Sequence, residues 1–313
     1  MAVKLDYEKN ENGCSYRLYK ADDKKILENT YILCNDAASE ILYQPHIAGK
    51  KLQDKMAEVS VAFMDAVGTK ILNGKKHGQV TELIFLAGGL YYQLNHGFKI
   101  KYDRILPQCF LGIKRQRIEG SEGEFTAVAT YENFESLPDN GTVIIGDTIA
   151  TGATLQKGIY HLLDALEERR YKLENLIVCS LACSVNGAEL LKEVETRVKR
   201  DFPGAKVYLF VTEQLFHLMP DGTDLRFLYP DCIMPEETGK RVLERYGDYL
   251  GKEMKCAVFD WGTRCKNPIK HYHEFMEFVL DMKERKLDPK SRAVMEKMEK
   301  ETKESIEAFE RPL

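Results

Sequence analysis

The stretch TVIIGDTIATGAT, residues 142–154, joins an apolar run to a loop of small and hydroxyl-bearing residues. Its apolar part, Val143–Ile145, is short and continuously hydrophobic, which is typical of a strand buried on both faces of a sheet. Asp147 follows this run, and Thr151–Thr154 leads into an amphipathic pattern over Leu155–Arg170. This order predicts a buried strand, a glycine-containing loop and a helix.

The same pattern recurs along the chain. Glu82–Leu86 is a short apolar run that Ala87–Gly89 stops. Leu176–Ala182 and Lys206–Val211 have the composition of buried strands, and a helical pattern over Gly187–Arg200 lies between them. Strands that alternate with helices predict an α/β fold with a doubly wound parallel sheet covered on both faces. Right-handed crossovers then bring the functional loops together at the carboxyl ends of the strands.

The regions around this core have different patterns. Lys51–Leu72 has helical spacing of its apolar residues, whereas Gly112–Asn140 is polar and carries a Gly-Ser turn at 120–121. We interpret Gly112–Asn140 as an antiparallel hairpin or a mobile flap that can cover a site. The segment after His271 is charged and helix-prone, and we expect it to pack on a neighbouring element or on a partner subunit. The predicted organisation is an N-terminal extension (1–50), a core (51–268) and a helical C-terminal tail (269–313).

Composition excludes several classes of protein. The 313 residues carry a net charge of −4 from 49 acidic and 45 basic side chains, so no overall positive field attracts nucleic acid. No apolar run approaches the roughly 20 residues that span a bilayer, and the N-terminus lacks the order of a signal peptide. The eight cysteines include no CxxC pair and are typical of small buried residues in a reducing compartment. We therefore expect a cytoplasmic protein without a nucleic-acid or membrane partner.

The loop after the central strand has the chemistry of a phosphate site. A glycine at 152 permits close approach of the backbone, the N–H groups of residues 151–154 can point into one concavity, and the helix adds its positive end. Thr151 and Thr154 add hydroxyl donors, and Asp147 stands where it could accept hydrogen bonds from ribose hydroxyls. The alternative is that Asp147 and Thr154 only cap a helix. Capping does not account for the whole run from Ala150 to Thr154, so phosphate binding is favoured.

These residues resemble the type I phosphoribosyltransferases, whose signature is an apolar strand, one or two acids and a Thr-Gly-x-Thr/Ser loop. The similarity is closest to the uracil phosphoribosyltransferases, and it covers roughly Lys50 to Pro268. Four segments occur in that family's order: Leu86-Ala-Gly88, Gly112-Ile-Lys-Arg115, Tyr131 ahead of Ala150-Thr-Gly152, and Asp260-Trp-Gly-Thr-Arg264.

The resemblance implies a glycosyltransferase of nucleotide salvage. The enzyme would transfer a phosphoribosyl group from phosphoribosyl pyrophosphate to a nucleobase, uracil or a related pyrimidine, and would release pyrophosphate. It also implies a Mg²⁺ cofactor and a homodimer. The base would lie near Met219–Pro230 and be read largely by backbone groups.

The resemblance further implies a set of site residues. The implied catalytic residues are Asp147, Arg115, Asp260 and Arg264, with Asp260 also on the metal. The implied substrate-binding residues are Ala87, Gly88, Thr148, Ala150, Thr151, Gly152, Ala153 and Thr154.

Three departures from the family's pattern keep other functions open. Gly146 stands where the family has an acid, and Leu86 replaces an arginine whose contact with pyrophosphate is worth roughly 1.5–3 kcal/mol. Residues Asp231–Lys255 intervene before the Asp260 segment. The alternatives are a non-catalytic nucleotide-binding regulator with the same fold, or an enzyme that uses the same cradle on another acceptor.

Other polar residues have simpler interpretations. Lys114, Arg115 and Arg117 could neutralise pyrophosphate or could equally protect a sheet edge from aggregation. His271 and His273 form a His-x-His pair with no evident third ligand, so we expect surface or capping roles for them and for His217.

Overall fold

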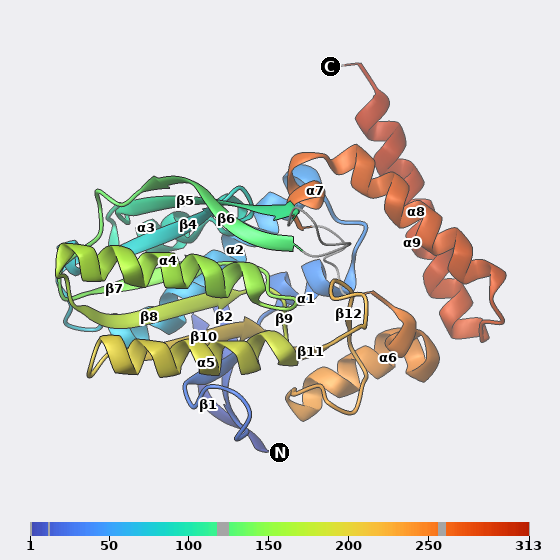
Figure 1. Ribbon diagram of the computed structural model, residues 1–313. Helices are drawn as coiled ribbons and strands as arrows, with labels where there is room; N and C mark the ends of the chain where they lie inside the picture. The colour runs from blue at the N-terminus through green and yellow to red at the C-terminus, as the bar shows by residue number, and fades with distance from the viewer. Residues whose placement is uncertain (1, 12, 118–124, 256–260, 313) are drawn as a thin grey trace.

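The computed structural model describes residues 2–11, 13–117, 125–255 and 261–312. Its centre is a sheet whose nine strands lie in the order β1-β2-β3-β10-β8-β7-β4-β5-β6 (Figure 1). The six strands from β3 to β5 in this order are parallel, and the β1–β2, β2–β3 and β5–β6 pairs are antiparallel. The strands are β1 (Ala2–Glu11), β2 (Cys14–Asp22), β3 (Thr30–Cys34), β4 (Val80–Leu86), β5 (Gln108–Arg117), β6 (Phe125–Asn133), β7 (Gly141–Gly146), β8 (Leu173–Ser180) and β10 (Lys206–Thr212). The chain thus has an α/β fold with a large, mostly parallel sheet.

Helices cover both faces of this sheet. Helices α4 (Ala153–Arg169) and α5 (Val185–Asp201) lie in front in Figure 1, and α1 (Asp36–Tyr43), α2 (Gly49–Val67) and α3 (Leu94–Tyr102) lie behind. Along β7, Ile144 belongs to the core on the α2 side and Ile145 to the core on the α4 side. Both faces of the central strands are therefore buried, which is why their sequences are continuously apolar rather than alternating.

The first 50 residues are more than an extension of the core. Strand β3 pairs in parallel with β10, and the β1–β2 hairpin continues the sheet beyond it. Helix α1 begins at an Asn35 cap, whose side chain accepts a hydrogen bond from the Ala38 N–H. The N-terminal segment thus completes one side of the central sheet, which the sequence analysis did not predict.

A buried carboxylate fastens the β1–β2 hairpin to the helices behind the sheet. Asp65 on α2 accepts hydrogen bonds from Lys9 Nζ at 2.9 Å, Tyr16 Oη at 2.8 Å and Lys101 Nζ at 2.6 Å. Burial opposes the ionisation of Asp65, but the hydrogen bonds from Lys101, Lys9 and Tyr16 outweigh it and lower its pKa below the ordinary value. The ionised carboxylate therefore stabilises the packing of four elements, β1, β2, α2 and α3.

We expect Asp65→Asn to lower the free energy of unfolding by about 2–3 kcal/mol at pH 7, because hydrogen bonds from two ammonium groups lose their charged acceptor. A carboxyl with a lowered folded pKa stabilises above its unfolded pKa, and this contribution is lost as the pH falls through the folded pKa. The difference between wild type and variant should therefore shrink in acid. Urea unfolding at pH 7 and pH 3 measures it, with Asp54→Asn, an exposed acid on the same helix, as the control. A loss equal to that of the control would contradict this assignment.

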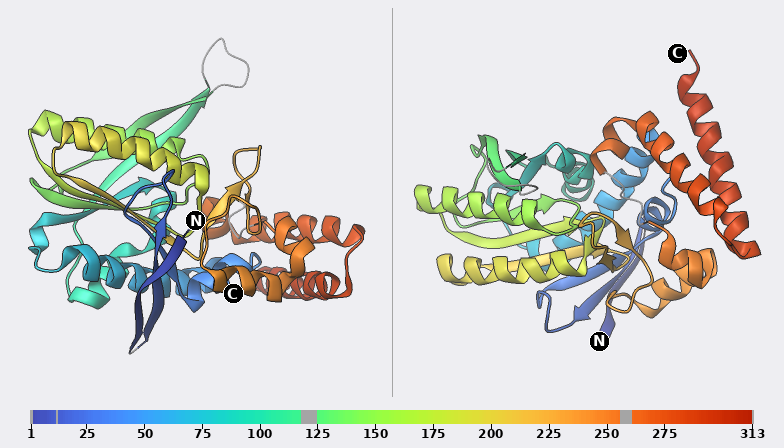
Figure 2. Two further views of the ribbon diagram at one scale, coloured as in Figure 1. Left: turned by 90° about the horizontal axis from the view of Figure 1, so that it is seen from below. Right: turned by 45° about the vertical axis from the view of Figure 1, so that its right-hand side comes forward.

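The antiparallel excursion predicted between residues 112 and 140 is present as the β5–β6 hairpin. Its strands pair from Phe110–Asn133 to Arg117–Phe125, with an irregularity at Gly112. The hairpin extends beyond the body of the sheet (Figure 2). Its arms are sheet strands, while residues 118–124, which include the Gly-Ser turn, lie outside the described residues. Closure of a flap over the site stays a prediction.

The C-terminal region is helical. It contains α6 (Glu236–Glu253), α7 (Trp261–Lys266), α8 (Pro268–Glu284) and α9 (Pro289–Glu310), and α8 and α9 form a hairpin at the right of Figure 1. Phe275 of α8 and Met295 of α9 belong to the same core as Phe63 of α2. The tail is thus packed on the chain's own core. Within the described residues, no helix has the length and apolar character needed to cross a membrane.

Candidate functional site

The strand order places a topological switch between β4 and β7. From β4 the chain continues to β5 on one side, and from β7 it continues to β8 on the other. In open α/β sheets, ligands bind outside the carboxyl ends of the strands where the chain diverges in this way. The loops at this point are residues 87–93 and 147–152, which are two of the segments singled out in the sequence.

The two loops lie against each other. A Cβ built on Gly89 would be 3.2 Å from the carbonyl oxygen of Gly146, so the turn after β4 touches the end of β7. Ala87 and Gly88 therefore lie near the end of β7, which Asp147 follows directly. Gly88 opens a 3₁₀ helix, η3 (Gly88–Tyr92), and the peptide bond between Leu86 and Ala87 is cis.

Hydrogen bonds to the next crossover fix the shape of the loop after β7. The Ile149 N–H donates to Ala182 O at 2.9 Å, and the Ser184 N–H donates to Ile149 O at 2.8 Å. Ser184 Oγ also donates to Ala150 O and accepts from the Gly187 N–H, which caps α5. Residues 149–150 are thus held from β9 (Cys183–Ser184) and the start of α5.

The fold itself requires a glycine at position 152, for a reason that is not visible in the sequence. Its φ is +80°, and a Cβ at this position would lie 2.8 Å from Leu190 Cδ2 and 3.4 Å from Gly187 Cα. The left-handed backbone and the contact with α5 both require glycine. The sequence indicates close approach of a phosphate at this glycine, but a larger residue here would disturb the loop and α5 as well as any ligand.

Neither Asp147 nor Thr154 caps α4, so the capping alternative is wrong. The N-cap of α4 is Gly152, and no side chain makes a capping hydrogen bond there. Asp147 Oδ1 instead accepts from the Thr148 N–H at 2.9 Å, within the loop. Thr151, which precedes the N-cap, accepts a hydrogen bond at its Oγ1 from the Ala153 N–H, with 3.4 Å between the two atoms. The start of α4 also carries no acid, so its N–H groups are suited to an anion.

Asp147 has the electrostatics of a functional carboxyl. It is half-buried, and burial raises its pKa to about 7 although the Thr148 N–H acts in the opposite direction. In the described part of the chain, no basic side chain forms an ion pair with it. A carboxyl that titrates near neutrality at the end of a central strand is suited to accept hydrogen bonds from hydroxyl groups or to bind a cation.

Tyr92 is a site residue that the sequence analysis missed. Its side chain is fully buried, and its hydroxyl lies 2.8 Å from Thr148 Oγ1 and accepts from the Leu181 N–H at 3.1 Å. A Cβ on Gly146 would be 2.6 Å from Tyr92 Cβ. The tyrosine therefore fills the space that a side chain at position 146 would need, which explains the glycine at the place of an expected acid. Local sequence carries no signal for this contact between two separate loops.

Arg264 has a position that favours a structural role over the expected contact with pyrophosphate. It is fully buried, and its guanidinium donates to Ile47 O at 2.7 Å, Ile41 O at 3.0 Å and Gln44 O at 3.1 Å. These carbonyls belong to the end of α1 and the loop that follows it. We therefore replace the catalytic assignment of Arg264 with the support of this loop.

The side chains of the other two predicted catalytic residues, Asp260 and Arg115, lie outside the described part of the structure. Asp260, the expected metal ligand, lies outside the described residues. Arg115 lies on β5 opposite Ala127 of β6, and only its backbone is described. Among the described residues, no group of three or more His, Cys, Asp or Glu side chains could hold a metal.

The region where a base was expected lies next to the loop after β7. Strands β11 (Leu215–Leu218) and β12 (Leu225–Arg226) form a hairpin that joins β9 in a small sheet. A Cβ on Gly222, at its tip, would be 3.5 Å from Thr151 Cγ2. The hairpin therefore borders the predicted phosphate loop.

The histidines have the following environments. The Nδ1 of His217 lies 2.8 Å from Asp231, and its ring stacks on Tyr229 with centroids 4.1 Å apart. His271 is fully buried rather than on the surface, and its Nε2 donates to Pro45 O at 2.6 Å. His271 thus supports the loop after α1, as Arg264 does.

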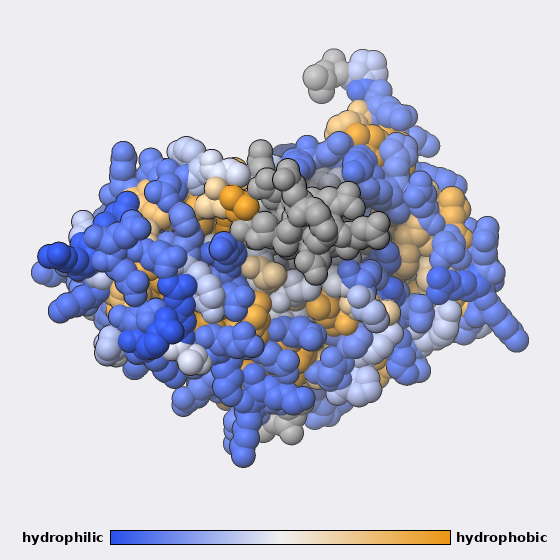
Figure 3. Space-filling model, in the orientation of Figure 1, coloured by the Kyte–Doolittle hydropathy of each residue, from blue (hydrophilic) through white to orange (hydrophobic). Residues whose placement is uncertain are grey.

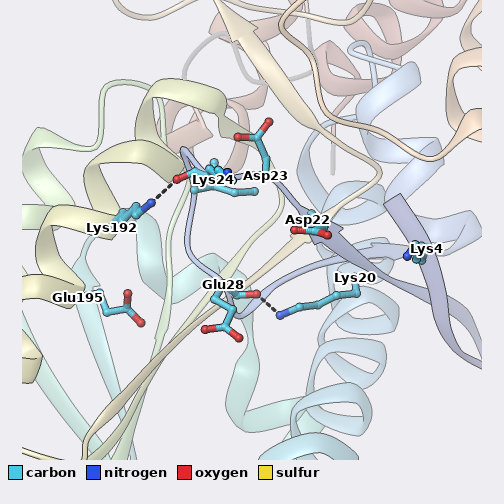
Figure 4. Close-up of a pocket in the computed structure, with 10 residues that line it drawn as sticks. Lys4, Lys20, Asp22, Asp23, Lys24, Glu28, Lys192 and Glu195 are labelled. Carbon is cyan, nitrogen blue, oxygen red and sulfur yellow. Dashed lines mark hydrogen bonds between the residues drawn. The ribbon is translucent and has the colours of Figure 1, made fainter. Parts of the chain in front are cut away.

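A cavity lies away from this site. It has a volume of about 610 Å³ and lies between the β2–β3 loop and α5 (Figure 4). Lys192 donates to the Lys24 carbonyl and Lys20 to the Glu28 carbonyl, and four acidic residues also line the cavity. This mixture of charges selects no class of ligand. In the view of Figure 3, most of the surface in colour is hydrophilic and apolar residues form scattered patches.

The comparisons with known proteins assign no family. No family model matches this chain, and no curated protein sequence matches it.

Proposed function

We propose that this protein is a phosphoribosyltransferase of the uracil type, with the corresponding fold. The observation that carries the proposal is the meeting of three features at the topological switch of the sheet. They are the uncapped start of α4, the carboxyl of Asp147 and the turn at Ala87–Gly88. The start of α4 would bind the phosphate, Asp147 would bind the ribose, and the turn would bind pyrophosphate.

The loop after β7 is suited to the phosphate of a ribose 5-phosphate group. The N–H groups of Thr151–Thr154 and the positive end of the α4 dipole would bind its oxygens. Asp147 would accept hydrogen bonds from the ribose hydroxyls and orient the sugar. Thr148 is held by the Tyr92 hydroxyl, so the loop between the strand and the phosphate has a fixed conformation before substrate binds.

The leaving pyrophosphate would lie against the backbone of Ala87 and Gly88. Of the described acids, Asp147 is the one at this strand end, and a single carboxylate fits Mg²⁺, because this ion keeps several waters and is usually bound through one or two carboxylates and the substrate's own phosphates. Asp147 offers that carboxylate, and Mg²⁺ when bound would neutralise charge on the departing pyrophosphate. The protein's own contribution is orientation of the donor beside an acceptor ring near the β11–β12 hairpin.

A second candidate function is a non-catalytic regulator that binds a nucleotide in the same cradle. The packing of Tyr92 against Gly146 favours it, because that contact leaves no space for a second carboxylate at the strand end. Leu86 and the buried Arg264 also reduce the positive charge available to pyrophosphate.

Pyrophosphate release separates the two functions. We would incubate the full chain with phosphoribosyl pyrophosphate, Mg²⁺ and each of a panel of bases, and follow pyrophosphate and nucleotide together. An enzyme releases both in equal amounts with at least one base. Binding of phosphoribosyl pyrophosphate without release under any base supports the regulator.

Thr154→Val tests the cradle under either function. We expect it to weaken binding of ribose 5-phosphate by roughly 10-fold or more, because a hydroxyl donor to a charged phosphate is lost while the side-chain shape is kept. Calorimetry measures the affinity. The matched control is Thr196→Val, which removes an exposed hydroxyl on α5 that donates to the Lys192 carbonyl. Equal affinities of Thr154→Val and wild type would refute phosphate binding at this loop.

A further inference from the structure

A second cavity lies at the opposite edge of the sheet from the phosphate loop. It has a volume of about 230 Å³ and is bordered by Val80, the first residue of β4. The candidate site lies beyond the other end of the same strand, which runs for seven residues or roughly 20 Å. The two sites therefore cannot share one small ligand.

The charged residues that line this cavity are all basic. They are Lys75, Lys76, His77 and Arg104, and no acid is among the lining residues. Lys75 forms an ion pair with Glu174. In the part of the chain that the structure describes, Lys76 and Arg104 have no carboxylate partner. Many other basic side chains of this protein pair with acids. Because Lys76 and Arg104 pair with none of the described acids, the cavity has an uncompensated positive charge.

Three aromatic rings, those of His77, Phe98 and Tyr102, line the cavity. Phe98 is buried, its ring stacks on His77 with centroids 5.9 Å apart, and it lies 4.6 Å from the ring of Tyr102. His77 Nε2 lies 2.6 Å from Ile105 O, and a carbonyl oxygen only accepts, so Nε2 carries the hydrogen and the ring orientation is fixed. A flat ligand group could pack against these preset rings.

We propose that this cavity binds an organic phosphate monoester, with the phosphate between Lys76 and Arg104 and a flat ring against Phe98 and Tyr102. Two uncompensated cations match the charge of a phosphate monoester near neutral pH. The volume is below the roughly 300 Å³ at which pockets for drug-sized ligands begin, which favours a single small ring over a larger ligand. The proposal uses no residue of the phosphate loop and does not depend on the proposed function.

Phenyl phosphate is a suitable probe, because it carries the ring and the phosphate but no ribose. We expect the full chain to bind it with one-to-one stoichiometry in calorimetry at low salt. Arg104→Gln and Lys76→Gln should each weaken binding at least 10-fold. The control is Lys206→Gln, which removes an exposed charge at the amino end of β10, on the same edge of the sheet, and should leave the affinity unchanged. Equal affinity in all three variants would overturn the proposal.

Two further measurements decide the remaining outcomes. Thr154→Val, which lies at the start of α4 and outside this cavity, should leave the affinity for phenyl phosphate unchanged, and a weaker affinity would mean that the probe occupies the loop after β7 instead. Inorganic phosphate should bind more weakly than phenyl phosphate by 10-fold or more, since it lacks the ring. Equal affinities for the two would overturn the aromatic half of the site, leaving only a patch of positive charge.

Discussion

Arg264→Met is expected to lower the free energy of unfolding by about 3–5 kcal/mol, the largest effect on stability that this structure suggests for one side chain. Methionine keeps much of the volume, but the backbone carbonyls of Ile41, Gln44 and Ile47 lose their donors in a buried environment. Arg264→Lys should give a smaller loss, because it keeps the charge without the planar fork that reaches several carbonyls. Urea unfolding at pH 7 measures both.

The control for Arg264 is Arg285→Met. Arg285 is 43% exposed and pairs with Glu253 and Asp281 at the surface, so its loss should change stability by less than about 1 kcal/mol. If Arg264→Met is no more harmful than the control, the guanidinium is not needed by the fold, and a role on substrate returns. In folded Arg264→Lys, unchanged affinity for phosphoribosyl pyrophosphate would support the structural assignment independently.

Asp147→Asn is expected to lower kcat/KM for phosphoribosyl transfer by on the order of 100-fold, comparable to loss of one preorganised polar group in other enzymes. Affinity for ribose 5-phosphate should change far less, because the phosphate is bound by the loop and the start of α4. The control is Glu168→Gln, which removes an exposed carboxylate near the other end of α4. Equal activity of Asp147→Asn and wild type would remove the carboxylate from the mechanism.

The pH dependence of Asp147 gives this prediction a second readout. Its folded pKa of about 7 means that the carboxylate form, which accepts hydrogen bonds, increases as the pH rises through 7. Wild-type activity should rise over that range, and Asp147→Asn should lose this limb of the profile.

The raised pKa of Asp147 also affects stability, which should fall as the pH rises, whereas activity should increase. A carboxyl with a raised folded pKa binds more protons in the folded state, so its contribution to stability falls between its unfolded pKa of about 4 and its folded pKa. Asp147→Asn should therefore have a higher Tm than wild type at pH 8 and a similar Tm at pH 4. A lower Tm at pH 8 would show that the carboxylate stabilises the fold, contrary to a functional role.

Much of the core was predictable because its signals are local. Helix α4 was predicted over Leu155–Arg170 and spans Ala153–Arg169, and β10 was predicted over Lys206–Val211 and ends one residue later. Continuous apolar runs identify strands buried on both faces, and the residues that follow them identify the loops. The proximity of the 87–89 and 147–152 loops was also predictable, since parallel strands bring their carboxyl ends to one edge.

The N-terminal strands were not predicted, because their apolar pattern is weaker. Strand β3 has only five residues, and β1 is largely exposed at the edge of the sheet. Edge strands bury one face at most, so their sequences carry more charge and less periodicity. The place of β3 beside β10, and of the β1–β2 hairpin beyond it, is decided by the packing of the whole sheet.

The sequence by itself determined the class of fold, the order of the central elements and the loop with the composition of a phosphate site. Only the tertiary structure decided what individual residues do within that frame. Tyr92 occupies the space that a side chain at Gly146 would need, and residues of α5 lie where a side chain at Gly152 would be. The structure also showed that the buried guanidinium of Arg264 donates to backbone carbonyls at the end of α1 and in the loop that follows it. The physical reason is that periodicity reports which face of an element is buried, whereas contacts between residues distant in the chain depend on how the elements pack.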